Sequence, residues 1–174
     1  MVITGLTPVT TGIPQNGRYA FVNSVPNNNN RWLTGGLDHT IDVSGFGYML
    51  LINCNNVAGE FLNATMNGLT VDYYYMISIY VANIVKSGSN LVEPDVTLKV
   101  ISTASDNALL GYASSGPLSE ANAMTWHRVD VSFKALATSV NLAISLNAGG
   151  SGSVSFVIDD IEIRVCGSSG HLTD

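Results

Sequence analysis

The sequence predicts an all-β protein, an antiparallel two-sheet β-sandwich of the jelly-roll type. Apolar and polar residues alternate with the two-residue period of a strand in several segments. Clusters of Gly, Ser, Asn and Pro separate these segments at short spacing. No segment has the pattern of an ordinary helix, so we expect strands joined by turns rather than by crossover helices.

Nine strands are expected. The segments Asp95–Ser102, Thr125–Lys134 and Ser139–Leu146 alternate, as half-buried antiparallel strands do. A strand is expected at Tyr73–Ile84, where the run Tyr73–Val81 is apolar or aromatic at both parities, which favours a mid-sheet strand covered on both faces. The other strands are expected at Arg18–Asn23, Tyr48–Asn53, Glu60–Met66, Ala108–Ser114 and Val154–Val165.

The composition indicates one folded domain. The 174 residues are 46% hydrophobic and 11% charged, too apolar for disorder and of a length that suits one buried core. We assign residues 1–166 to a single β-sandwich module and 167–174 to a Gly/Ser-rich linker or tail. Both ends resemble cuts in a longer extracellular protein.

Charge and hydropathy exclude two partners. The net charge of −6 offers no attraction to nucleic acid or to an anionic membrane surface. The longest apolar stretch, Tyr73–Val85, is interrupted by Ser78 and Asn83 and is shorter than a membrane-spanning helix requires. We therefore expect no nucleic-acid partner and no membrane insertion.

The sequence gives little sign of catalysis. The motifs GxSxG and HExxH and the P-loop are missing. Asp159 and Asp160 form a carboxylate pair, but adjacent strand residues point to opposite faces, so they suit acid/base chemistry poorly. We expect that the protein is not an enzyme.

The aspartate pair is more informative as a metal site. Parity places Asp159 with Val157, Ile161 and Ile163, and therefore turns it inward, while Asp160 takes the other face. A buried carboxylate needs a partner, and the chain has only 7 Lys and Arg. A calcium ion would supply one. Backbone N–H donors at a strand end or bulge are the alternative.

Several segments together carry a family resemblance. They contain YAFVNS, DHT, GYMLLIN, GEF and IDDIEIRVC, and lie at Gly17–Ser24, Asp38–Thr40, Gly47–Asn53, Gly59–Phe61 and Ile158–Cys166. In this order they resemble a jelly-roll surface module of large secreted Bacteroidetes proteins. Some elements are shared with MAM domains and with galactose-binding-like carbohydrate-binding modules. The resemblance spans nearly the whole chain.

The resemblance implies a structural cation held by Asp159 of DDI, Asp38 of DHT and Asn23 of VNS. The disulfide of the family does not carry over, because its usual Cys before the central strand is missing here. Cys54 and Cys166 fit no metal-ligand spacing. They form either a disulfide or two buried thiols.

Aromatic residues are the candidate sugar contacts, because sugar rings stack on exposed aromatic faces. Trp32, beside the polar loop 27–30, is the candidate ligand-binding residue, with packing over a sheet edge as the alternative. Alternation would expose Trp126, whereas the resembling families place it near the core, and a β-bulge would reconcile the two. We expect the run 73–75 and Tyr112 to pack, and His39 to form local hydrogen bonds.

These observations predict a non-catalytic binding or adhesion module, secreted or on the cell surface. Its expected partners are a glycan or cell-surface polysaccharide and the neighbouring domains of a larger protein. Calcium would have a structural role. The alternative is a structural spacer domain of a large cell-surface protein, without a ligand of its own.

Overall fold

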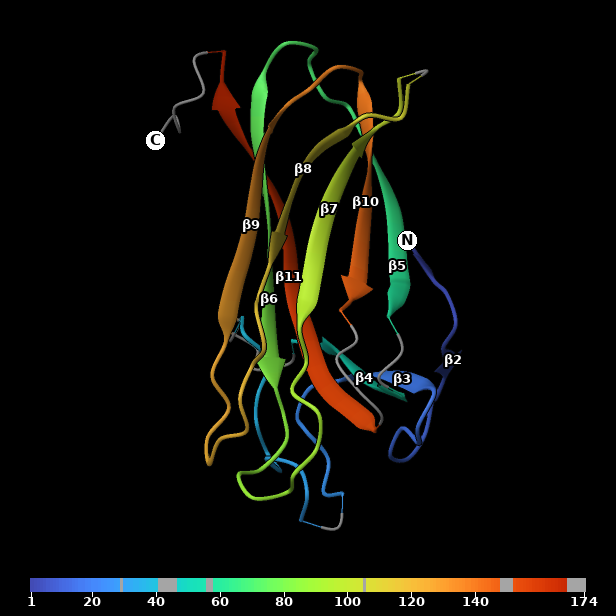
Figure 1. Cartoon of the computed structure of the whole chain (residues 1–174), viewed down its shortest axis with the longest axis vertical. Helices are drawn as coiled ribbons and strands as arrows, with labels where there is room; N and C mark the ends of the chain where they lie inside the picture. Colours follow the sequence, from blue (N-terminus) through green and yellow to red (C-terminus); the bar gives the residue numbers. More distant parts are fainter. Residues whose placement is uncertain (29, 41–46, 56–57, 105, 148–151, 169–174) are drawn as a thin grey trace.

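The structure is a computed structural model that describes residues 1–28, 30–40, 47–55, 58–104, 106–147 and 152–168. It contains two facing sheets (Figure 1). The first has, in spatial order, β1 (Val2–Ile3), β5 (Gly59–Asn67), β10 (Ser139–Leu146), β7 (Val96–Ser102) and β8 (Leu109–Ser114). The second has β2 (Thr7–Pro8), β3 (Arg18–Val22), β4 (Met49–Asn55), β11 (Ser153–Gly167), β6 (Tyr74–Asn83) and β9 (His127–Lys134).

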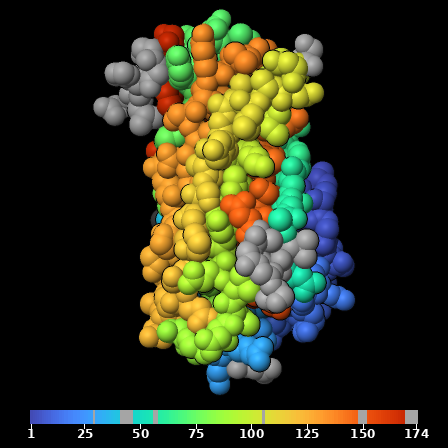
Figure 2. All heavy atoms as spheres, in the orientation of Figure 1, coloured from blue at the N-terminus to red at the C-terminus, as the bar shows by residue number. Residues whose placement is uncertain are grey.

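The predicted fold class is confirmed. All nine expected strands are present, and the described residues contain no helix, hence none that could cross a membrane. The paired strands are antiparallel, except β2 and β3, which are parallel. The long strands β6, β7, β9 and β10 run along the long axis of the molecule (Figure 1), and β7, β8 and β9 lie on the face that Figure 2 shows.

The strands β1 and β2 have two residues each, too few for a detectable periodicity, and so were not predicted from the sequence. β1 pairs with β5 in one sheet, and β2 pairs with β3 in the other. The N-terminal segment therefore crosses from one sheet to the other. It covers one side of the sandwich near the start of β5.

The main core fills the space between the sheets. In β9 the alternation is regular: Val129, Val131 and Phe133 are buried, and the residues between them are exposed. β6 pairs with β11 on one side and β9 on the other, which confirms the predicted mid-sheet position. Its inward residues join those of β7, β10 and β11 in one apolar cluster.

A second apolar cluster lies on the outer face of the six-stranded sheet. Its buried members are Val25, Trp32, Met49, Leu51, Ala82, Ile84, Val85 and Val157. The loop between β3 and β4 supplies Trp32, which forms an isolated antiparallel bridge with Val85. Trp32 is only 1% exposed, so its ring does not offer the open face that a sugar contact needs. Packing, the alternative, is what this tryptophan does.

A bulge interrupts β11 and corrects the parity argument. Asp159 pairs with Tyr80 and Glu162 with Ser78, so two residues of β11 stand opposite one residue of β6. Asp160 lies in the bulge with a φ of 47°. Beyond it the faces exchange: Ile161 packs against the main core, whereas Asp159 stays on the outer face with Val157. The prediction that Asp159 shares a face with Ile161 and Ile163 is therefore wrong.

Both cysteines are free thiols. Cys166 is buried, and Cys54, on β4, is half-buried. Burial raises the pKa of Cys54 to about 11, because a thiolate is poorly solvated there. Of the two alternatives, a disulfide or two thiols, the structure has the two thiols.

Candidate functional site

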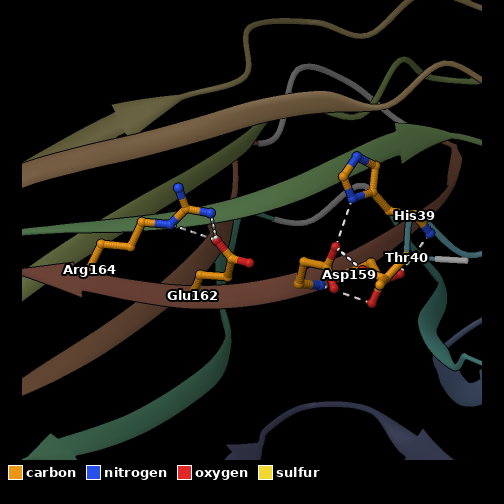
Figure 3. A network of polar contacts seen from close by, with 6 residues as sticks. His39, Thr40, Asp159, Glu162 and Arg164 are labelled. Carbon is orange, nitrogen blue, oxygen red and sulfur yellow. Dashed lines mark hydrogen bonds and ion pairs between the residues drawn. The ribbon is translucent and has the colours of Figure 1, made fainter. Parts of the chain in front are cut away.

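Two segments 120 positions apart meet on the outer face of the six-stranded sheet. One is the DHT loop, Asp38–Thr40, and the other is the aspartate bulge, Asp159–Asp160, on β11 (Figure 3). The bulge lies where the pairing of β11 with β4 stops at Ile158. The convergence of Asp38 with Asp159, which the family resemblance implied, is thus present in the fold.

The carboxylate of Asp159 is satisfied by backbone donors. Its Oδ2 accepts the N–H of His39 at 2.8 Å, and its Oδ1 accepts the N–H of Asp160 at 2.9 Å. This is the bulge arrangement that the sequence analysis kept as the alternative to a metal ion. Burial raises the pKa of Asp159, its two N–H donors lower it, and the nearby charges of Asp160 and Asp38 raise it further.

The carboxylate of Asp160 connects the bulge to the DHT loop. Its Oδ2 lies 2.7 Å from Nδ1 of His39 and also accepts the hydroxyl of Thr40. Asp160 therefore points to the same side as Asp159. The prediction that it takes the opposite face is wrong, because the positive φ in the bulge reverses the alternation at this residue.

Aromatic rings hold His39 in place. Its imidazole stacks on Tyr80 of β6 with ring centroids 3.6 Å apart, and Trp126 meets it edge-on at 5.7 Å. His39 is a hydrogen-bonding residue, as predicted, but its partner Asp160 is distant in sequence rather than local. Trp126 is half-buried just before β9, so no bulge in β9 is needed to explain its position.

Asp38 is the unusual residue of this site. It is only 8% exposed, and its Oδ2 is the buried side-chain oxygen that lacks a hydrogen-bond partner among the described residues. Gly47 lies directly against it, so that a Cβ added there would stand 1.6 Å from Oδ2 and 2.9 Å from the carbonyl oxygen of Thr40. An unpartnered buried carboxylate oxygen is costly and needs compensation.

The predicted calcium ligands can be compared with this geometry. Asp38 fits a hard cation, since it has a free buried oxygen and the described ion pairs bring no Lys or Arg to it. Asp159 is nearby, but both its oxygens already accept hydrogen bonds. Asn23 is exposed, one residue before the bridge between Ser24 and Leu37. The described residues contain no group of three or more His, Cys, Asp or Glu side chains arranged to hold a metal.

A small hollow lies beside the bulge. Its volume is about 140 Å³, and Phe21, Tyr48, Asp159 and Asp160 are among the residues that line it. Phe21 is 53% exposed and Tyr48 is 64% exposed. Phe21 stands opposite Leu50 in the pairing of β3 with β4, so Tyr48 is its diagonal neighbour on the same face. We call this pair of rings and the space beside them the aromatic hollow.

Phe21 and Tyr48 were not predicted from the sequence as functional residues. Both lie in segments that carry the family resemblance, but their adjacency depends on the register of β3 against β4. Tyr112 was expected to pack and is instead 68% exposed on β8, an edge strand. Tyr75 packs as expected and stacks on Phe133 at 5.8 Å.

Neither a protein-family model nor a curated protein matches the chain. Among solved structures it is similar to the EclA C-terminal domain, a sugar-binding protein, with 23% identity, a TM-score of 0.50, and coverage of 80% of this chain and 93% of that one. A CBM4 structure has 13% identity, a TM-score of 0.42 and coverage of 77% and 92%. The CBM22-1 xylan-binding domain of Paenibacillus barcinonensis Xyn10C has 13% identity, a TM-score of 0.40 and coverage of 68% and 72%. The likeness to the EclA domain supports the sandwich fold.

Proposed function

We propose that this protein is a non-catalytic carbohydrate-binding module of an extracellular or cell-surface protein. The observation that carries the proposal is the aromatic hollow. Two neighbouring rings, each more than half exposed, form an apolar surface beside the hollow, and exposed rings of this kind are the faces on which sugar rings stack. The sugar-binding EclA domain, which has a similar fold, agrees with this role.

The surroundings of the rings suit a glycan. Asp159 and Asp160 border the hollow, and polar groups beside an apolar face are what a sugar with many hydroxyls requires. Three contacts with the DHT loop hold the bulge in place, and a fourth hydrogen bond joins Asp160 to Asp159 within it, so the wall of the hollow is rigid. A rigid site reduces the entropy cost of binding.

The test is glycan binding by the intact protein and by matched variants. A glycan array identifies the ligand, and isothermal titration calorimetry then compares Phe21→Ala and Tyr48→Ala with the parent. Each variant should weaken binding by about tenfold or more, since about 1.4 kcal/mol of lost contact corresponds to a factor of ten in Kd. Tyr112→Ala is the control, because Tyr112 is equally exposed but lies on β8 of the other sheet.

Two results would contradict the proposal. If all three variants bind like the parent, the glycan site is elsewhere. If the folded parent binds no glycan on the array, the spacer role in a larger surface protein is the better explanation.

We also propose a structural calcium ion at Asp38, with Asp159 nearby. The unpartnered buried oxygen of Asp38 supports this, because calcium prefers carboxylate and carbonyl oxygens. Such an ion would neutralise part of the negative charge that Asp38, Asp159 and Asp160 gather at the site. It would stabilise the convergence of the DHT loop with β11 and take no part in chemistry.

A further inference from the structure

Among the residues that the structure describes, the second half of β11 has a partner strand on one edge only. β6 pairs with β11 as far as Gly167, but β4 pairs with it only up to Ile158. Among the described residues, no strand lies along the other edge from Ile161 to Val165. This part of β11 reaches the surface near the end of the chain (Figures 1 and 2). An open edge of this kind is a template for another strand.

The inward face of this segment is incompletely covered. Ile163 stands opposite Ile77, and Val165 opposite Tyr75, so both point towards the space between the sheets. Ile77 and Tyr75 are buried, whereas Ile163 is 37% exposed and Val165 is 48% exposed. Two apolar side chains on the core side of a sandwich are thus left partly in water.

The outward face carries one charge of each sign. Glu162 and Arg164 are two residues apart on the same face and form an ion pair of 2.8 Å (Figure 3). Their side chains are 42% and 59% exposed, so both remain able to contact another molecule. An exposed pair of this kind contributes little to the stability of a single chain.

We propose that this edge pairs with the same edge of a second copy of the chain. The two β11 strands run antiparallel, with the two-fold axis at Ile163. Glu162 then stands opposite Arg164 of the partner subunit, and the symmetry repeats this contact with the charges exchanged. The six-stranded sheets of the two subunits become one continuous sheet.

The sequence of the edge favours a second copy over another partner. An antiparallel pairing about Ile163 produces two contacts between Glu162 of one chain and Arg164 of the other. The same surface therefore complements itself, as a two-fold interface requires. Moving the register by one residue brings apolar side chains against charged ones. The bulge at Asp160 ends the pairing at Ile161, so the shared segment is short and the association reversible.

β9, an edge strand of the same sheet, provides a matched control. Arg128 and Asp130 have the same two-residue spacing and form a looser ion pair of 3.7 Å. However, the inward residues of β9, such as Val129 and Val131, are already buried. β9 therefore has the charges of β11 without the exposed apolar side chains.

The experiment uses two variants of the full chain, Glu162→Arg and Arg164→Glu. The first leaves two positive residues on the edge and the second leaves two negative ones, so each opposes pairing with itself. Sedimentation equilibrium at about 0.15 M salt, where charges act over roughly 8 Å, measures the dimer constant. The parent should dimerise, and each variant alone should do so at least tenfold more weakly.

Mixing separates pairing between chains from the ion pair within one chain. An equimolar mixture of the two variants should recover dimers. In a mixed dimer both residues of the pair are positive in one chain and negative in the other, so every cross-strand contact joins opposite charges. Asp130→Arg on β9 should dimerise like the parent. Circular dichroism and thermal melts establish that every variant is folded.

Three results would overturn the proposal: a parent that is monomeric at about 1 mM, single variants that dimerise as the parent does, or a mixture that does not recover dimers. In the first case the charge pair protects an edge that stays unpaired. In the second the dimer uses another surface, and loss of association in Asp130→Arg would identify it as β9.

Discussion

Gly47 is a position where the structure tolerates no side chain. A Cβ at this residue would stand 1.6 Å from Oδ2 of Asp38, far inside any van der Waals contact. The obstacle is a buried carboxylate rather than the end of a flexible chain, so Gly47→Ala must displace the DHT loop. Overpacking of this kind costs about 1–3 kcal/mol. For a domain of this length, that lowers Tm by about 2–12 °C.

A double-mutant cycle with Asp38 tests whether its carboxylate is what a side chain at Gly47 would strike. In the Asp38→Ala background the carboxylate is gone, so most of the cost of Gly47→Ala should disappear. Part of it should persist, because the carbonyl oxygen of Thr40 also lies 2.9 Å from the new Cβ. Urea unfolding of the four proteins gives the coupling energy, which we expect to be about 1 kcal/mol or more.

Gly36→Ala is the control for the loss of a glycine. Its Cβ would meet Sδ of Met124 at 3.0 Å, and that side chain can move; the carbonyl oxygen of Leu33 lies at 3.2 Å, a milder contact than the one at Gly47. This variant should change the free energy of unfolding less than Gly47→Ala and show no coupling to Asp38. If the two substitutions at Asp38 and Gly47 are additive within about 0.3 kcal/mol, the steric argument is refuted.

Three further predictions concern the site and the second cluster. Trp32→Ala should lower the free energy of unfolding by about 3–5 kcal/mol in urea titrations, because the ring is buried. A loss below about 1 kcal/mol would show that the ring of Trp32 is not buried. Calcium at a hundredfold excess over its Kd should raise the free energy of unfolding by about 2.7 kcal/mol relative to EDTA, and Asp38→Asn should abolish this gain. Thermal melts that superimpose in calcium and in EDTA would refute the proposed ion. Burial raises the pKa of Asp159 above 3.8, so the folded state holds this proton more tightly than the unfolded state, and stability is lost as the pH rises above about 4. In EDTA, the unfolding free energy of the parent should therefore fall relative to Asp159→Asn between about pH 3 and pH 6, and a flat or rising difference would contradict the assigned direction.

The strands were predictable from the sequence because their signal is local. Alternation in β9, and apolar residues at both parities in β6, depend only on which faces are buried, so their positions follow from the order of residues. The convergence of Asp38 with Asp159 was also anticipated, although through the family resemblance rather than through any local pattern. Tertiary contact decided how these carboxylates are satisfied.

Three features were beyond the reach of the sequence, for related physical reasons. The bulge at Asp160 adds one residue to β11 relative to β6, and no alternation pattern reports such a mismatch between strands. Trp32 follows a polar loop, but the loop folds over an apolar sheet face and buries the ring. Phe21 and Tyr48 become a surface pair only through the register of β3 against β4. Local periodicity determined where the strands are, while pairing and coverage between distant segments decided which side chains are buried and which are presented to a ligand.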